Sequence, residues 1–398
     1  MGEESISRFL ADTRTQMIHT LSDLVAIPTV NPPGQAYKQC VSYLSRHLKT
    51  WKIEHQVISL SKGKYPRFAI LGEVGKGQKS LHLHGHYDVV PSDSPRQFNP
   101  ELKEERLYGR GASDMKSGLV VMLWSLLYFK RRRKGTQGRI SFSFVPDEET
   151  GGRLGTQHIL GSGLLPRPSS GMLMPEPTSG AVWNANKGAL TFRVEIKGKA
   201  AHVALESQGD NAFESMIRVV QPLLDLKESI QKRKTSLPVS PPEAAHSVFL
   251  TGGMSGSGLN FNVVPDKAFF TIDRRINPEE KLSDAKQELM DVLEDARQKG
   301  IRLEVETLQE GDSSSADLDS PLALALKESI TEVTGKIPSF ELCPGLCEIR
   351  YFISQGIPAY AYGPGLLEVS HGPEEYVRIP DMSRFTEIYI RTILRLLN

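Results

Sequence analysis

The pattern of apolar residues along the chain changes near residue 187 and changes back after residues 311–319, and this is the strongest constraint on its fold. Before the first change, the strand-like runs FAILGEV, SLHLHGHYDVV and RISFSFVP are interleaved with helix-like stretches at 115–130 and 153–162. Strands interleaved with helices predict an α/β domain whose central sheet is mostly parallel.

Between the two changes, the strand-like runs GALTFRVEIKG, DKAFFTIDRRI and IRLEVETL alternate apolar and polar residues. Long helix-like segments at 205–232 and 280–299 separate them, which predicts a compact α+β domain. A chain of 398 residues is longer than a single hydrophobic core usually accommodates, so we predict two domains. An α/β domain formed by 1–186 and 310–398 is interrupted by an inserted α+β domain at 187–309.

Composition narrows the range of partners. The formal net charge is +1, so neither a nucleic acid nor an anionic membrane is expected as a partner. No apolar run approaches the length of a membrane span, and MGEESISRFL lacks the apolar core of a secretory signal. The three cysteines, Cys40, Cys343 and Cys347, are too few for a disulfide scaffold and favour a reducing compartment. We therefore expect a cytoplasmic protein.

Histidines and an acid share one face of the strand in LHLHGHYDVVP, where His82, His84, His86 and Asp88 alternate with other residues. A histidine within a strand is usually buried and hydrogen-bonded, and this is the interpretation for His82 and His84. At the strand end, Asp88 can hold His86 in one tautomer, as a neighbouring acid does for metal-bound histidines. His86 is therefore predicted to be a metal ligand.

Four further acid or histidine sites follow in Gly/Pro-rich turns: Asp114, the pair Glu148-Glu149, Glu176 and His371. Asp114 precedes an apolar helix, where it could be an N-cap, a bridge between two cations, or both. One member of Glu148-Glu149 could bind metal while the other takes a proton from a metal-bound water. Two histidines with four or more carboxylates suit a pair of divalent metal ions, which predicts a metal-dependent amide hydrolase.

Seven motifs then occur in an order that resembles the M20 family of metallo-aminoacylases and peptidases. They are HGHYDVVP, YGRGASDMKSG, DEETGG, MPEP, KGKAAHV, NFNVVPD and SHGPEEY. The likeness is greatest to the acetylornithine deacetylase / succinyl-diaminopimelate desuccinylase branch, and it extends over nearly the whole chain.

This resemblance implies two zinc ions, or cobalt in some members. One ion would be bound by His86 and Glu176, and the other by Glu149 and His371. Asp114 would bridge the two ions, Asp88 would orient His86, and Glu148 would be the general base and later the proton donor.

The inserted domain resembles the family's dimerisation or lid domain, which implies a homodimer and makes the interrupted α/β domain the catalytic one. His202 would reach into the partner's active site and stabilise an oxyanion, although a surface-loop histidine is the plainer interpretation. Arg275 would bind the substrate carboxylate, with its neighbour Arg274 facing the other way. Asn262, and less strongly Asn260, are polar candidates for substrate binding.

One segment departs from the family pattern. Cys343–Arg350 stands where many members have a Gly/Thr/Ser-rich loop with Asp, so the acyl group and the amine remain open. The predicted function is a deacylase of N-acyl amino acids, and a dipeptidase or carboxypeptidase acting on short peptides is the alternative. A non-catalytic scaffold is disfavoured because Glu148 and all five candidate ligands are present.

Overall fold

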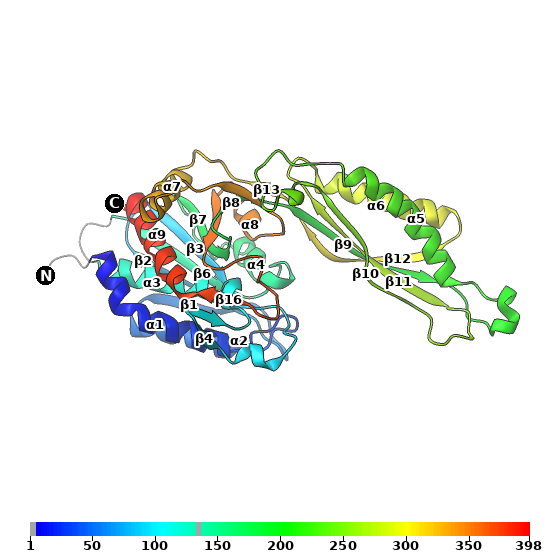
Figure 1. Cartoon of the computed structure of the whole chain (residues 1–398), viewed down its shortest axis with the longest axis horizontal. Helices are drawn as coiled ribbons and strands as arrows, with labels where there is room; N and C mark the ends of the chain where they lie inside the picture. The colour runs from blue at the N-terminus through cyan, green and yellow to red at the C-terminus, as the bar shows by residue number, and fades with distance from the viewer. Residues whose placement is uncertain (1–4, 133–136) are drawn as a thin grey trace. The chain divides into compact units, whose positions relative to one another are not determined.

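The computed structural model describes residues 5–132 and 137–398 (Figure 1). The stretch MGEESISRFL, which we expected to lack a secretory signal, has its first four residues outside these ranges. The chain divides into two compact units. The first contains Met1–Asn184, Ala316–Glu341 and Glu348–Asn398, apart from the residues not described. The second contains Ala185–Ser315 together with Leu342–Cys347, a segment that the sequence analysis assigned to the α/β domain.

The main sheet of the first unit has a mixed strand order. Its path runs β1(Glu54–Ser59), β2(Phe68–Gly75), β6(Arg139–Val145), β3(Ser80–His86), β7(Gly171–Pro177), β15(Ala359–Gly363), β8(Val182–Asn186) and β13(Ser314–Ser315), and β14(Phe340–Cys343) also pairs with β8. Parallel pairings join the central strands β6, β3, β7 and β15, whereas β1 with β2, β2 with β6, β15 with β8 and β8 with β13 pair antiparallel. The α/β class is confirmed, but the expectation of a mostly parallel sheet is wrong because antiparallel strands flank the parallel centre.

The parallel centre determines where polar residues meet. Every residue of β3 and β7 is buried, as expected for strands covered on both faces. Since His86 pairs with Val145 and Leu83 pairs with Leu173, the carboxyl ends of β3, β6 and β7 lie at one edge of the sheet. The chemistry-bearing residues at or just beyond these ends therefore come together there.

Helices pack around this sheet. They are α1(Ile6–Ala26), α2(Tyr37–Thr50), α3(Ser117–Arg131), α4(Thr156–Gly161), α7(Pro321–Thr334), α8(Ile349–Ile353) and α9(Ile379–Leu397). α3 is buried from Ser117 to Phe129, and α9 packs against α1, α3 and α7 (Figure 1). A separate small sheet has three strands in the order β16(Tyr376–Arg378), β5(Arg106–Tyr108) and β4(Glu101–Lys103).

The second unit has a four-stranded antiparallel sheet in the order β10(Val248–Ser257), β11(Lys267–Ile276), β9(Gly188–Lys197) and β12(Arg302–Gly311). α5(Ala212–Ile230) and α6(Leu282–Gln298) pack on it. The helix expected from residue 205 begins only at Ala212, because the Asn211 side chain caps it by accepting from the amides of Phe213 and Glu214. Within the described parts of the chain, no helix combines the length and apolar character needed to cross a membrane.

Candidate metal centre

The imidazole of His86 is the centre of a buried polar cluster at the edge of the main sheet. Its Nε2 lies 3.2 Å from Oδ1 of Asp114 and 3.6 Å from Oε1 of Glu176. The side chain of His86 is 1% exposed, so this nitrogen faces carboxylates rather than solvent. The parallel strands β3 and β7 thus bring together two predicted ligands that are 90 residues apart in the chain.

Asp88 contacts the other nitrogen of the same ring. Nδ1 of His86 lies 3.1 Å from the Asp88 carbonyl oxygen and 3.4 Å from its Oδ1. The Asp88 carboxylate also accepts from the backbone amides of Glu148 (3.3 Å) and Glu149 (3.2 Å), and from Nδ2 of Asn31 (2.9 Å). One buried acid therefore orients the imidazole and holds the turn that carries the two glutamates.

Asp114 faces a histidine with each of its oxygens. Oδ1 lies 3.2 Å from Nε2 of His86, and Oδ2 lies 3.3 Å from Nε2 of His371. Asp114 is not an N-cap, because it lies in the short helical turn Ala112–Lys116 and α3 begins at Ser117. Its carboxylate is thus free to bridge two cations, with one oxygen for each.

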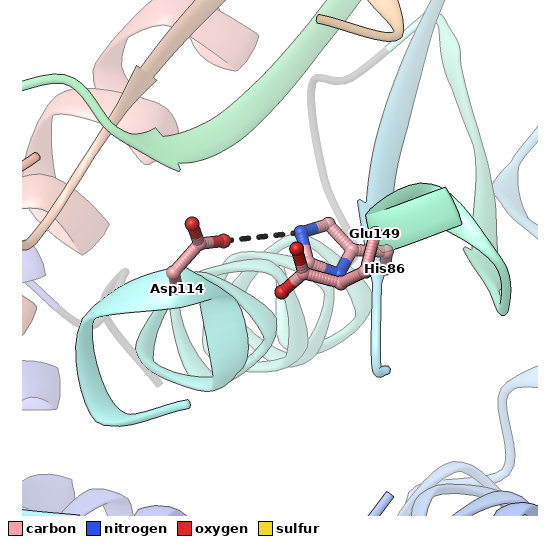
Figure 2. A group of neighbouring side chains, drawn as sticks. All are labelled: His86, Asp114 and Glu149. Carbon is pink, nitrogen blue, oxygen red and sulfur yellow. Dashed lines mark ion pairs between the residues drawn. The ribbon is translucent and has the colours of Figure 1, made fainter. Parts of the chain in front are cut away.

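Glu149 and His371 complete the cluster. Oε2 of Glu149 lies 3.2 Å from Nε2 of His371, and its Oε1 accepts from the Val90 amide. Ligand atoms of His86, Asp114 and Glu149 all lie within 4.8 Å of one another, and Figure 2 shows the Asp114 carboxylate directed at the His86 ring. The side chain of His371 is 50% exposed, so this end of the cluster is open to solvent.

The five predicted ligands therefore form one chain of contacts, in the order Glu176, His86, Asp114, His371, Glu149. Two imidazoles and three carboxylates are a donor set that suits Zn²⁺ and related divalent ions. Their allocation to two separate ions stays a prediction.

The electrostatics of the protein groups alone also fit bound cations. Burial raises the pKa of Glu176 to about 7, against the charge of His86. Burial and the neighbouring charge of Asp114 raise the pKa of Glu149 to about 7. Burial opposes ionisation of Asp114 too, but hydrogen bonds from His371 and His86 hold its pKa well below the ordinary value. A divalent cation would relieve this accumulation of buried negative charge.

Glu148 differs from its neighbour in having no hydrogen bond to its carboxylate among the described residues. Its backbone is held, since its amide donates to Asp88 and its carbonyl accepts from the Gly151 amide. Burial raises the pKa of Glu148 well above its ordinary value, and the charges of Glu176 and Glu348 add to the shift while His86 opposes it. A partly buried carboxyl without a fixed partner is free to exchange a proton with a bound molecule.

Comparisons with known proteins add a family to this geometry. Residues 82–395 match the model of peptidase family M20/M25/M40. The chain belongs to this family. The predicted resemblance to M20 is therefore confirmed, and the protein is a hydrolase of amide bonds in a family of metallo-hydrolases.

Individual M20 relatives match over most of their length. A probable succinyl-diaminopimelate desuccinylase of Staphylococcus aureus (strain MRSA252) is 24% identical, with 94% of this chain and 96% of the relative covered. A solved di-peptidase of Saccharomyces cerevisiae has a TM-score of 0.80 at 15% identity, with 98% of both chains covered. A solved dinuclear metal binding peptidase of the M20 family from Bacillus subtilis has a TM-score of 0.66 at 17% identity, with 97% of this chain and 99% of that chain covered. These two structures establish the likeness in fold.

The remaining site candidates of this M20 protein lie in the second unit, so they are described separately from the cluster. His202 is exposed, and its Nδ1 accepts from the Ala204 amide at 3.1 Å. The Asn262 carbonyl accepts from Val203, and a short β-bridge joins His202 to Val263. His202 and Asn262 are therefore neighbours, and their catalytic roles stay predictions.

The two adjacent arginines on β11 face in opposite directions, as strand alternation predicts. Arg274 is fully buried and forms ion pairs with Glu280 (3.0 Å) and Glu288 (2.6 Å). Arg275 is 29% exposed and pairs with Asp273 at 2.8 Å. Because Arg274 is fully buried between two acids whereas Arg275 is partly exposed, Arg275 is the better of the two candidates for binding a substrate.

Sequence reasoning missed several buried charges near the cluster. Arg110 and Glu375 lie inside the YGRG and SHGPEEY motifs but had no assigned role, and they form a buried ion pair of 2.8 Å. His84, expected to be structural, contacts Ser143 and Glu348, and Glu348 belongs to the segment that departs from the family pattern. For Arg110 the available signal was its position between Gly109 and Gly111 in a ligand-bearing motif.

Proposed function

We propose that this M20 protein is a deacylase of N-acyl amino acids that uses two divalent metal ions, zinc in preference to cobalt. The observation that carries the proposal is Asp114, whose two oxygens each face a different histidine. The name of the Staphylococcus aureus relative, a probable desuccinylase, supports an N-acyl substrate over a peptide.

The residues divide between the ions as their contacts suggest. His86 and Glu176 would hold one ion, Glu149 and His371 would hold the other, and Asp114 would bridge them. When bound, the ions would polarise the scissile carbonyl group and lower the pKa of the attacking water.

Glu148 takes a proton from the attacking water and later gives it to the nitrogen of the leaving amine. Because burial raises the pKa of Glu148, this carboxyl can hold the proton between the two transfers. Asp88 keeps Glu148 at its position through the backbone amide and keeps Nε2 of His86 directed at Asp114 and Glu176.

We further propose that the second unit, the predicted dimerisation or lid domain, joins two copies of the chain. The edge strand β10 and the outer face of α5 expose large apolar side chains, which a second copy would cover. They are Phe213, Ile217, Leu224, Leu250 and Met254. In such a dimer His202 would stabilise the oxyanion in the partner's site, and Arg275 and Asn262 would bind the substrate's polar groups.

The decisive experiment measures free-amine release by zinc-loaded and cobalt-loaded protein. The substrates are N-acetyl, N-succinyl and N-formyl amino acids alongside simple dipeptides, with chelator-treated protein as the control. The proposal expects chelator-sensitive release from at least one acyl amino acid. Release from dipeptides alone would replace the deacylase with a peptidase, and release that the chelator does not affect would exclude the metal-dependent mechanism.

A further inference from the structure

Arg110 and Glu375 form an ion pair that links two segments far apart in the chain. Nη1 of Arg110 lies 2.8 Å from Oε2 of Glu375, and each residue is 1% exposed. Arg110 lies four residues before Asp114, and Glu375 lies four residues after His371. Each member of the pair thus belongs to the segment that carries one of these two predicted ligands.

The hydrogen bonds of the pair cross between the segments. Oε1 of Glu375 accepts from the backbone amides of Ser113 and Asp114, both at 3.0 Å. Nη2 of Arg110 donates to the His371 carbonyl at 3.0 Å. The acid from the His371 segment therefore holds the backbone of Asp114, and the base from the Asp114 segment holds the backbone of His371.

The surrounding backbone strengthens this cross-brace. The Gly109 amide donates to the Glu375 carbonyl at 2.9 Å, and Tyr108 pairs with Tyr376 where β5 meets β16. Charge-assisted hydrogen bonds in a buried setting are shorter and stronger than neutral ones, so they hold backbone positions tightly. The distance between Asp114 and His371 is thereby fixed by groups that touch neither ligand side chain.

We propose that Arg110 and Glu375 are positioning residues for a divalent cation held by Asp114, Glu149 and His371. This inference rests on the proposed metal-dependent function for its ligand set. The His86–Glu176 end of the cluster lies on β3 and β7, whose sheet pairing holds it independently. Asp114 belongs to both proposed sites, but His371 belongs only to the site shared with Glu149, so loss of the ion pair weakens that site more than the His86–Glu176 site.

The test compares Glu375→Gln with wild-type protein by calorimetric titration of metal-free protein with zinc alone. Gln keeps an oxygen for the amides of Ser113 and Asp114 but loses the charge that pairs with Arg110. We expect one of two zinc sites to lose about 10- to 100-fold in affinity, the usual effect of removing a residue that supports a ligand. The matched control is Glu288→Gln, which removes an acid from the buried Arg274 in the second unit.

A general loss of stability is distinguished by the thermal midpoint of each metal-free variant. Both variants are expected to lower the midpoint, but only Glu375→Gln should weaken zinc. Two zinc sites of wild-type affinity in Glu375→Gln would overturn the proposal. So would an equal loss of zinc affinity in Glu288→Gln.

If Glu375→Gln fails to fold, the same zinc titration is carried out with Arg110→Lys. Lys keeps the positive charge but lacks the planar fork that reaches both Glu375 and the His371 carbonyl. The same selective loss is expected, and wild-type zinc binding would again overturn the proposal. Failure of the proposed function looks different, because wild-type protein would then bind two zinc ions without releasing amine from any acyl amino acid.

Discussion

The two compact units hold their candidate residues in different ways. In the first, the His86 side chain is buried among carboxylates, Asp114 contacts both His86 and His371, and the backbone amides of His86 and Asp114 donate to Met115 and Glu375. In the second, His202 is exposed and its side chain accepts one hydrogen bond, from Ala204. The first arrangement is preorganised for ions. The second has the role proposed above for His202 only if a second copy of the chain and a substrate bind there.

The largest effect on turnover is expected from a change at the metal cluster of the first unit. Glu148→Gln removes the proposed base but keeps its size, so kcat should fall by about 10²- to 10⁴-fold. Zinc stoichiometry should remain two, because Glu148 is not among the proposed ligands. Steady-state kinetics and metal analysis of the same preparation measure both quantities.

The matched control for this change is Glu101→Gln, at an exposed position on β4 paired with Lys103. It should leave kcat at the wild-type value. Unchanged turnover in Glu148→Gln would remove Glu148 from the mechanism, and loss of zinc would make it a ligand instead.

The next effect tests whether the second unit acts across a dimer. His202→Ala should lower kcat by about 10²- to 10³-fold, the effect of removing one oxyanion donor. Mixing it with Glu148→Gln subunits should restore part of the activity, because a hybrid dimer contains one site with both groups intact. Turnover after subunit exchange is the measurement, and exchange is verified separately by mass labelling. A mixture as inactive as its components would place His202 in its own subunit's site or outside catalysis.

The same contrast explains what the sequence could predict. His86, Asp114, Glu149 and Glu176 were recognisable because each occurs where an apolar run meets a Gly- or Pro-rich turn, a local signal. The pairing of Arg110 with Glu375 joins residues 265 apart, and nothing in either motif specifies the other.

Sheet direction was missed for a related reason. The pairing of β2 with β6 and of β8 with β15 depends on long-range packing, whereas residue periodicity reports only that a segment is a strand. The start of α5 was predicted too early because the apolar pattern already begins at Leu205. The helix itself starts only after Asn211, whose side chain caps it.

A smaller effect separates the two arginines of β11. Arg275→Ala should raise KM by about 10- to 100-fold, corresponding to one lost charged hydrogen-bonding group, with little change in stability. Arg274→Ala should instead lower the free energy of unfolding by about 3 kcal/mol, because Glu280 and Glu288 lose a buried partner. Kinetics and urea unfolding of both variants check the pair. If Arg274→Ala raised KM and Arg275→Ala lowered the free energy of unfolding instead, Arg274 would be the residue that faces the substrate.

The smallest effect probes how rigidly the turn that carries Glu148 is held. Gly152 has φ +72°, and a Cβ added there would lie 2.3 Å from Oε1 of Glu348. Gly152→Ala should lower the free energy of unfolding by about 1–2 kcal/mol through the backbone conformation alone, and by more through the contact with Glu348. Gly163→Ala is the matched control, because it has φ +67° and an added Cβ there meets no atom within 4 Å.

The difference in the free energy of unfolding between Gly152→Ala and Gly163→Ala, measured in urea, isolates the contact of the added Cβ with Glu348. Glu348 cannot move aside freely, since its Oε2 lies 2.8 Å from Nε2 of His84 and both side chains are fully buried. We therefore expect Gly152→Ala to be the less stable variant and to lower kcat, because the displaced turn carries Glu148. Equal stability of the two variants would show that Glu348 yields without cost, and that this side of the first unit is less rigid than its hydrogen bonds indicate.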